Sequence, residues 1–261
     1  MMLFTRAVYI GVDLSGGKYD VAYAAIDADR QLLALGQGHM EETLAFIGGQ
    51  HQAVVALNAP PRPNQGCLAE SAAREGLGDA LAGESGEEMR LAEYLLRERS
   101  LRVYKTPAQE KDCRAWVRLG FDLYKRMAAL GYQPYPTVDA DLQILEAVPQ
   151  VCYAVWLERL PFPKTGLEGR LQRQLVLYDH GLDIPDPMAF FEEVTRYRIL
   201  QGILPEEVPY NPDELNALAN AYAAWLASKR PAETCLVGDP GEGQILVPVE
   251  QILVQYTAPG G

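Results

Sequence analysis

The N-terminal part of the chain carries the pattern that most constrains its fold. An apolar run over residues 7–12 ends at Asp13, and a Ser-Gly-Gly turn at residues 15–17 leads into a second strand-like run over residues 18–26. This pattern predicts a hairpin with a carboxylate at the C-terminal tip of its first strand, where open α/β sheets gather their ligands. Glycines beside that carboxylate let backbone and ligand approach closely, which suits a bound cation or phosphate. An ordinary tight hairpin carrying a solvated aspartate fits the same pattern.

Three strands, a helix and a further strand follow from the periodicity of this region. Strand-like residues 7–14, 19–26 and 31–36 are joined by tight turns and predict an antiparallel meander. A helical pattern over residues 41–47 precedes an uninterrupted apolar run over residues 53–57, which is typical of a strand buried on both faces. Because a helix precedes this strand, it is expected to run parallel to the first.

The rest of the chain predicts a largely helical C-terminal half. The patterns indicate strands at residues 102–105 and 142–146, helices over residues 87–99, 110–130, 165–180, 187–200 and 213–228, and a closing hairpin from residues 235–237 and 244–247. Residues 59–87 are rich in proline, glycine and small residues and are expected to form a lid or an insertion, with a short helix at residues 69–74. We find no internal repeat or low-complexity linker, so we expect a single elaborated domain over residues 1–261.

The composition favours a globular protein with reduced thiols. The 261 residues are 48% hydrophobic and carry a formal net charge of -12, so broad tracking along phosphates is not expected and any nucleic-acid contact requires a local basic groove. The cysteines form no CxxC pair and the histidines no HxxxH pair, so a structural zinc site is not expected. We find no secretory leader and no apolar run of membrane-spanning length, which makes the cytoplasm the expected location and argues against a membrane partner.

The predicted order of elements is that of the ribonuclease H-like fold. This fold is a mixed α/β sheet, a three-strand antiparallel meander plus parallel strands, flanked by helices, and here it would carry a helical C-terminal elaboration. Short motifs occur in matching order along nearly the whole chain: Gly11-Val12-Asp13-Leu14-Ser15, Leu57-Asn58-Ala59-Pro60, Glu146-Ala147-Val148-Pro149, Lys164 with Gly169-Arg170 and Arg173, Asp213 to Ala224, and Gly238-Asp239. With these motifs the chain resembles the domain-of-unknown-function family 429, whose members are predicted ribonuclease H-like nucleases.

The resemblance implies a metal centre built from carboxylates of separate elements. In this superfamily such side chains converge on one or two divalent cations, which activate water and stabilise the leaving oxygen of a phosphodiester. Mg²⁺ and Mn²⁺ are hard ions that prefer oxygen ligands. Carried over by position, Asp13, Glu146 and Asp213 are the expected catalytic and metal-binding residues.

Two asparagines depart from the family pattern. Asn58 replaces a carboxylate expected after the second central strand, and Asn216 stands where Asp is more usual. The resemblance keeps Asn216 as a metal ligand and gives Asn58 the role of orienting a ligand, a water molecule or the substrate. Because an amide oxygen brings no negative charge, the metal affinity is expected to be reduced. A weak nuclease, altered chemistry and an inactive relative all remain open.

Local sequence offers other roles for two of the carboxylates. Asn211 is a good N-cap, Pro212 suits the first helical position, and acids in a first turn complement the helix dipole, so Asp213 fits a capping role beside the ligand role. Glu214 resembles the reciprocal partner of a capping box. Without the family pattern, Glu146 fits a solvated position at a strand end.

Three basic residues near one predicted helix are candidates for phosphate binding. Lys164 flanks this helix, and Arg170 and Arg173 lie on it three positions apart, near one face. In the functional interpretation they bind substrate phosphate, the arginines through a bidentate fork and the lysine as a point charge. The alternative is a solvated helix face with local pairs to Glu168 or Asp179.

The sequence leaves three functions open. The first is a Mg²⁺- or Mn²⁺-dependent phosphodiester hydrolase, a nuclease acting on structured or small nucleic acids. The second is a catalytically inactive ribonuclease H-like binding or scaffold protein, whose cleft has lost charge at two positions. The third is an actin- or sugar-kinase-like phosphotransferase, because residues 13–18 resemble a first phosphate loop, although a convincing second glycine-rich loop is missing.

Overall fold

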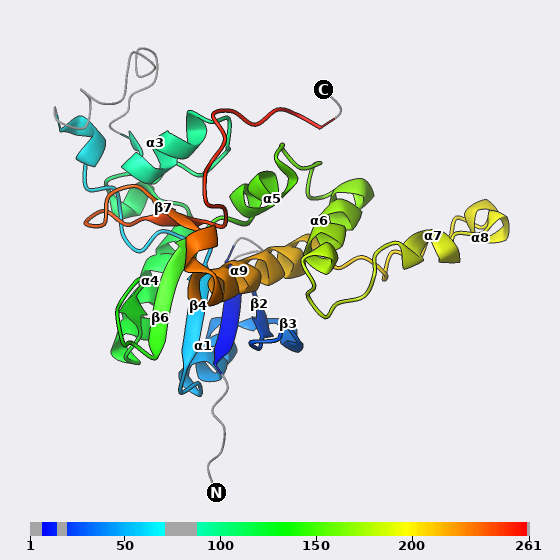
Figure 1. The fold of residues 1–261 in the computed structure, drawn as a ribbon, viewed down its shortest axis with the longest axis horizontal. Helices are drawn as coiled ribbons and strands as arrows, with labels where there is room; N and C mark the ends of the chain where they lie inside the picture. Colours follow the sequence, from blue (N-terminus) through cyan, green and yellow to red (C-terminus); the bar gives the residue numbers. More distant parts are fainter. Residues whose placement is uncertain (1–6, 15–19, 71–87, 260–261) are drawn as a thin grey trace, which may run out of the picture.

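The protein forms a mixed β-sheet with helices packed on both faces (Figure 1). The computed structural model describes residues 7–14, 20–70 and 88–259. The strands in this part are β1 (Val8–Asp13), β2 (Asp20–Ile26), β3 (Leu32–His39), β4 (Ala53–Leu57), β5 (Gln133–Pro134), β6 (Leu142–Ala147), β7 (Cys235–Val237) and β8 (Ile245–Val247). They pair in the order β3-β2-β1-β4-β6-β8-β7, with β5 beside β6.

The helices surround this sheet and become more frequent toward the C-terminus. They are α1 (Met40–Gly48), α3 (Leu91–Arg97), α4 (Ala115–Ala129), α5 (Pro149–Leu157), α6 (Leu167–Asp179), α7 (Ala189–Glu193), α8 (Arg196–Leu200) and α9 (Pro212–Lys229), with 3-10 turns at Cys67–Ala69, Glu110–Asp112 and Pro231–Glu233. Across the ranges that the structure describes, no helix combines the length and the apolarity needed to cross a bilayer.

The N-terminal architecture confirms the sequence prediction. β1, β2 and β3 form the antiparallel meander, and β4 runs parallel to β1 after the helix α1. Every residue of β4 is buried, as its uninterrupted apolar run predicted. The mixed sheet with flanking helices is therefore the ribonuclease H-like α/β fold that the resemblance implied.

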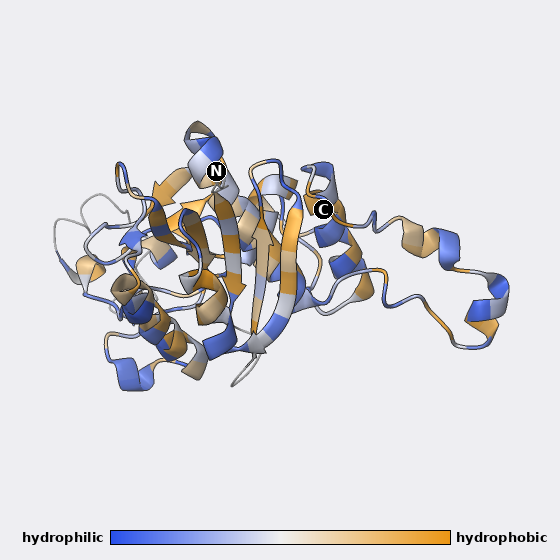
Figure 2. Ribbon diagram, turned by 90° about the horizontal axis from the view of Figure 1, so that it is seen from below, coloured by the Kyte–Doolittle hydropathy of each residue, from blue (hydrophilic) through white to orange (hydrophobic). Residues whose placement is uncertain are grey.

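The two faces of the sheet contact separate cores. Ile10 and Val12 of β1 face a core formed with α1 and α4. Tyr9 faces the opposite core, formed with α5, α6 and α9. Side chains alternate between faces along each strand and neighbours in register share a face, so register decides which core a side chain enters. Figure 2 shows the apolar residues concentrated in these central strands.

Several segments after β4 differ from the sequence prediction. Residues 102–105 form no strand. Val103 is buried in a core with α3 and α5. Just after this segment, the backbone N–H of Thr106 donates to a carboxylate oxygen of Glu93 at 2.8 Å instead of to a neighbouring strand. The helix α5 was not predicted. It begins at Pro149, whose fixed φ and missing N–H suit the first turn of a helix.

The predicted helix over residues 187–200 is two short helices, α7 and α8, on an arm that extends from the body of the molecule (Figures 1 and 2). Large apolar side chains are exposed along this arm: Met188, Phe191, Tyr197, Ile199, Leu200, Ile203 and Leu204. The arm therefore adds little to the packed core. The predicted lid or insertion over residues 59–87 lies partly outside the described residues.

Candidate functional site

Asp13 ends β1 and is the centre of a polar cluster buried against α9. Its carboxylate is fully buried and accepts a hydrogen bond from the Nδ2 of Asn58 at Oδ1 and another from the Nδ2 of Asn216 at Oδ2, the latter at 2.7 Å. The Oδ1 of Asn58 accepts the backbone N–H of Leu14 at 2.9 Å, so this amide is held at both ends. We refer to Asp13, Asn58, Asp213 and Asn216 as the Asp13 cluster.

Strand register explains why Asn58 meets Asp13. Val12 of β1 lies opposite Leu57 of β4 in a parallel pair, so the residues that follow them leave the sheet side by side at the same edge. The backbone N–H of Asn58 also donates to the carbonyl of Val12 at 3.4 Å. Two residues from separate sequence motifs therefore come together where parallel strands end.

Gly11 lets α9 lie directly on β1. A Cβ at this position would come within 2.0 Å of the carbonyl oxygen of Ala217 and within 2.2 Å of the backbone nitrogen of Ala221. Only glycine allows so close an approach of two backbones. The contact brings Asn216, which precedes Ala217 on α9, against the end of β1.

The N-terminus of α9 confirms the predicted cap. The Oδ1 of Asn211 accepts the backbone N–H groups of Asp213 and Glu214, each at 3.0 Å, and the carboxylate of Glu214 accepts the N–H of Asn211 at 2.9 Å. Pro212 occupies the first helical turn. Because Asn211 and Glu214 make the cap, the side chain of Asp213 is not required for it.

The side chain of Asp213 instead interacts with Lys164 and Asp13. Its Oδ1 lies 3.9 Å from the Nζ of Lys164, and the Asp213 side chain is 27% exposed. Burial and the negative charge of Asp13 raise the pKa of Asp213, while Lys164 opposes this rise. Asp213 also lies three positions before Asn216, so both occupy one face of α9.

Asn220 is a member of this face that sequence analysis missed. Its Nδ2 donates to the carbonyl of Val12 at 2.9 Å. Its Oδ1 is buried and has no hydrogen-bond partner among the residues that the structure describes. Asp213, Asn216 and Asn220 follow one another at i, i+3 and i+7, the spacing of a single helix face, and this repeat of polar residues was the available signal.

Glu146 does not meet Asp13, and the expected shell of three carboxylates is corrected on this point. Glu146 lies in register with Leu57, which lies in register with Val12, and Leu57 and Val12 both face the α1–α4 core. Asp13 is the next residue along β1 and therefore points to the opposite face. The two carboxylates leave the sheet on different sides.

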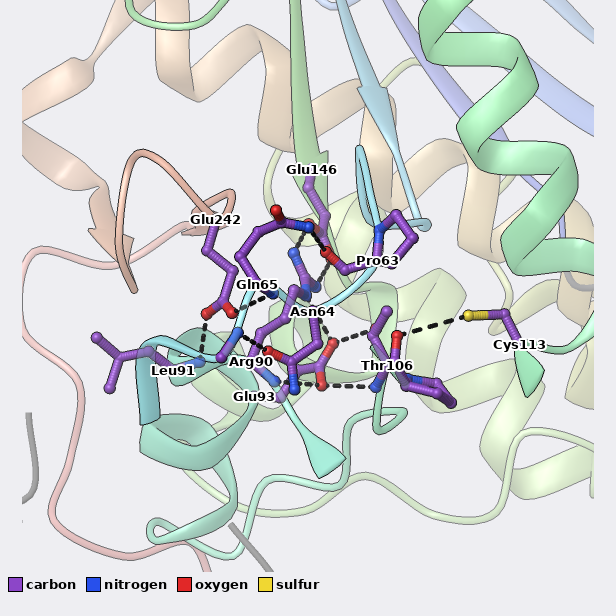
Figure 3. A network of polar contacts seen from close by, with 12 residues as sticks. Pro63, Asn64, Gln65, Arg90, Leu91, Glu93, Thr106, Cys113, Glu146 and Glu242 are labelled. Carbon is purple, nitrogen blue, oxygen red and sulfur yellow. Dashed lines mark hydrogen bonds and ion pairs between the residues drawn. The ribbon is translucent and has the colours of Figure 1, made fainter. Parts of the chain in front are cut away.

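Glu146 binds Arg90 on its own side of the sheet (Figure 3). The Nη1 of Arg90 lies 2.8 Å from Oε2 of Glu146 and the Nη2 lies 2.6 Å from Oε1, a bidentate pair in which both residues are buried. Burial raises the pKa of Glu146, and the positive charge of Arg90 opposes this rise. Although burial disfavours the charged form of Arg90, Glu146 and Glu93 hold its pKa above the ordinary value. A solvated Glu146 is therefore excluded as well.

This pair belongs to a wider network that joins α3 to the sheet (Figure 3). The Nε of Arg90 lies 2.8 Å from Oε1 of Glu93, which also accepts the hydroxyl of Thr106. Glu242 is fully buried and accepts the backbone N–H groups of Gln65 and Leu91 at 2.9 and 2.8 Å. These bonds tie loops and a helix together, which is a structural role. Nothing in the local sequence marks Arg90 as a buried arginine.

The two arginines of α6 serve structure, which corrects their predicted substrate-binding role. Arg170 donates its Nε to the carbonyl of Tyr210 at 2.9 Å and its Nη2 to the carbonyl of Glu206 at 3.0 Å. Arg173 is 1% exposed and donates to the carbonyls of Phe162 and Gly169 at 2.8 and 2.9 Å. Of the three predicted basic residues, only Lys164 lies beside the Asp13 cluster.

The described ranges contain no group of three or more His, Cys, Asp or Glu side chains arranged to hold a metal ion. The oxygen donors at this site are the carboxylates of Asp13 and Asp213, while Asn216 turns its amide nitrogen toward Asp13. The amide oxygen of Asn216 would join them only after rotation of its side chain, and such a set of oxygen ligands is one that Mg²⁺ and Mn²⁺ accept. With only two formal charges, its affinity is expected to be low.

Comparison with known protein families gives a match over most of the chain. The model of a family described as Protein of unknown function (DUF429) matches residues 11–242. This range includes the Asp13 cluster and the Arg90–Glu146 pair. No curated protein matches the chain.

Proposed function

Since the chain belongs to the DUF429 family, we propose that it is a divalent-metal-dependent phosphodiester hydrolase whose centre is the Asp13 cluster and whose metal affinity is low. One observation carries this proposal: Asn216 donates to Oδ2 of Asp13 at 2.7 Å, and Asp213 lies one helical turn before Asn216 on the same face of α9, so two carboxylates far apart in the sequence lie at one end of β1. Two neighbouring carboxylates repel each other, and a bound cation would relieve this repulsion. Carboxylates are also the preferred ligands of Mg²⁺ and Mn²⁺.

Each residue of the cluster has a distinct role in this proposal. Asp13 and Asp213 hold the cation, and Asn216 supplies an amide oxygen once its side chain has rotated. Asn58 fixes the orientation of the Asp13 carboxylate, because its own amide is anchored to the backbone of Leu14. The cation, when bound, activates water and stabilises the leaving oxygen.

Lys164 is the proposed contact for the substrate phosphate. Its side chain is 42% exposed and its Nζ lies 3.9 Å from Asp213, so the ammonium group is both accessible and next to the centre. A lysine offers a point charge to a phosphodiester. The acidic chain, with its net charge of -12, fits small or structured phosphodiesters better than long nucleic acids.

Metal binding and hydrolysis test the proposal together. We expect Mn²⁺ to bind at millimolar concentration in calorimetry and to support slow hydrolysis of bis(4-nitrophenyl) phosphate. Asp13→Asn should abolish both, because it removes the charge at the centre of the cluster. The matched control is Asp179→Asn, an exposed carboxylate outside the cluster. Hydrolysis that continues unchanged in Asp13→Asn excludes this centre.

A second candidate, a non-catalytic binding or scaffold protein, is favoured by a different observation. Both oxygens of Asp13 accept amide hydrogen bonds, and Glu146 is bound to Arg90, so each buried carboxylate is compensated by the protein itself. This candidate predicts no Mn²⁺ isotherm at millimolar metal. A clear isotherm that Asp13→Asn removes would count against it.

The phosphotransferase alternative stays a prediction. Most of the loop that suggested it, residues 15–18 of 13–18, lies outside the described residues. An increase in melting temperature on addition of ATP would support it, and an unchanged melting temperature would remove its remaining argument.

A further inference from the structure

Large apolar side chains are gathered on the arm that leaves the body of the molecule between α6 and α9 (Figures 1 and 2). We define the arm as residues 187–204, which contain α7 and α8. Seven of its side chains are 41–73% exposed, and they are half of the large apolar side chains that the described residues expose: Met188, Phe191, Tyr197, Ile199, Leu200, Ile203 and Leu204. No residue of the Asp13 cluster lies on the arm, so this inference does not depend on the proposed function.

The apolar surface of the arm is nearly as large as one side of a protein–protein interface. Side chains of this size, about half exposed, leave roughly 100 Å² each in water, so the seven together offer on the order of 700 Å². Specific interfaces bury about 800 Å² on each partner, whereas the largest apolar patch on a monomer is normally about 300–600 Å². A patch of this area therefore indicates a protein partner.

The arm has a defined local structure although these side chains are not buried. At the start of α8, the hydroxyl of Thr195 accepts the backbone N–H of Arg198 at 3.1 Å. At its end, Gly202 has a φ of +70°, and its N–H donates to the carbonyl of Ile199 at 3.0 Å. The N–H of Ile203 donates to the carbonyl of Arg198 at 2.9 Å, which completes a Schellman cap. A helix of five residues is marginal in water, and burial of its apolar side chains against a partner would stabilise it.

Polar bonds also fix the direction of the arm. The Nη1 of Arg198 lies 2.8 Å from Oε2 of Glu193, which ties α8 to α7. Where the chain returns to the body, the Nε of Arg170 donates to the carbonyl of Tyr210 at 2.9 Å and its Nη2 donates to the carbonyl of Glu206 at 3.0 Å. A surface that is already held in one arrangement loses less conformational entropy when it binds. The arm is therefore preorganised for a partner.

The charge of the chain favours a second copy of this chain as that partner. The arm holds two arginines and two glutamates and is formally neutral, whereas the whole chain carries a net charge of -12. The bodies of two such acidic molecules repel each other, and this repulsion falls with distance. A neutral arm that stands away from the body is where two copies can meet with the least repulsion. The same net charge opposes binding to an anionic membrane surface, which attracts clustered cations.

We propose that the protein dimerises through the arm, with residues 187–204 of one copy packed against the same residues of a second copy. A two-fold axis brings one patch from each copy together, so each patch covers the other. The two patches then bury on the order of 1,400 Å² in total, within the range of about 1,200–2,000 Å² found for specific interfaces.

Sedimentation velocity of the intact chain tests this inference. We expect a monomer of 28.8 kDa at about 1 µM and a dimer of twice that mass at about 100 µM, with a Kd of about 10 µM. The double variant Tyr197→Ser with Leu200→Ser should weaken the dimer by about 10-fold or more, because each dimer loses apolar side chains from both copies. Both side chains are exposed in a single copy, so the melting temperature at about 1 µM should match that of wild type.

The matched control is Val138→Ser with Val254→Ser, which removes apolar side chains that are 88% and 89% exposed outside the arm. This variant should dimerise as wild type does. Raising NaCl from about 0.05 to about 0.5 M should tighten the dimer, because salt screens the repulsion between the acidic bodies.

Four results would each overturn the inference. The first is a chain that stays monomeric at about 100 µM, whether or not it binds phosphatidylcholine vesicles. The second is an unchanged Kd in the arm variant, and the third is an equal loss of affinity in the control variant. The fourth is a dimer that dissociates in salt, which would be held by ion pairs instead of by the apolar patch.

Discussion

Asn216→Asp puts the charge balance of the Asp13 cluster to a direct test. The two side chains have the same shape, so the substitution replaces an amide donor by a carboxyl group 2.7 Å from Oδ2 of Asp13 while both positions stay buried. Losing a hydrogen bond to a charged acceptor costs about 1.5–3 kcal/mol. Two like charges at this separation repel by about 6 kcal/mol at an effective dielectric constant of about 20.

The introduced carboxyl can avoid part of this cost by taking up a proton. Burial and the charge of Asp13 raise its folded-state pKa above the unfolded value of about 3.9. Its protonated form donates to Asp13, so the stability of the variant is fully present below the unfolded pKa and is lost as the pH rises through the folded pKa. We therefore expect a penalty of about 3 to 5 kcal/mol near pH 8 and a much smaller one near pH 5.

Urea unfolding of wild type, Asn216→Asp and Asn216→Ala in EDTA, at about pH 5 and about pH 8, measures these free energies. Asn216→Ala loses the hydrogen bond but introduces no charge, so its penalty should not depend on pH. Millimolar Mn²⁺ should restore Asn216→Asp, because a cation neutralises the paired carboxylates, and should stabilise Asn216→Ala much less, because that variant keeps only Asp13 and Asp213 as ligands. Equal penalties for Asn216→Asp at both pH values, insensitive to Mn²⁺, would refute the electrostatic argument.

Four further outcomes follow from the same geometry. Arg90→Met should cost about 3–5 kcal/mol in urea unfolding, since it leaves two buried carboxylates uncompensated; a change below about 1 kcal/mol would show that they protonate without loss. Gly11→Ala should abolish soluble folded protein, measured by circular dichroism and gel filtration, because its Cβ would collide with the backbone of α9; a normal melting curve contradicts the close contact. Asp213→Asn should gain stability relative to wild type as the pH rises from about 4 to about 7, since the raised pKa of Asp213 means that wild type loses stability over this range; parallel pH profiles would rule this out. Leu200→Ser on the arm should change the free energy of unfolding by no more than about 0.5 kcal/mol, because Leu200 is 73% exposed; a larger loss would mean that the arm is packed.

The sheet and its first carboxylate could be predicted because local pattern determines them. Alternating and continuous apolar runs marked β1 to β4, and a helix before β4 made it parallel to β1. The pairing of Asn58 with Asp13 then follows from two strands that end together. The cap of α9 was equally local, since Asn211 and Glu214 lie within one helical turn.

Glu146 shows where local pattern stops being sufficient. Its motif marks the end of a strand, but its face depends on a register that differs by one residue from that of Asp13. A shift of one residue turns a side chain to the other face of a sheet, and no sequence pattern within either strand measures that shift. The burial of Arg90 was hidden for a related reason, because its partner Glu146 comes from a distant strand.

Asp13 and Glu146 are both buried, but they differ in how readily the protein groups that compensate their charge could be replaced by a metal ion. Glu146 is held by a buried guanidinium, and moving Arg90 away would leave a buried charge, a cost of several kcal/mol. Asp13 is held by amides. Turning the Asn58 amide would also break its hydrogen bond with the backbone N–H of Leu14. Rotation of the Asn216 side chain would replace its amide nitrogen by its amide oxygen beside Asp13, and would break only the hydrogen bond to Asp13. The proposed cation would therefore enter at Asp13 rather than at Glu146, and the rotation of Asn216 would set its affinity.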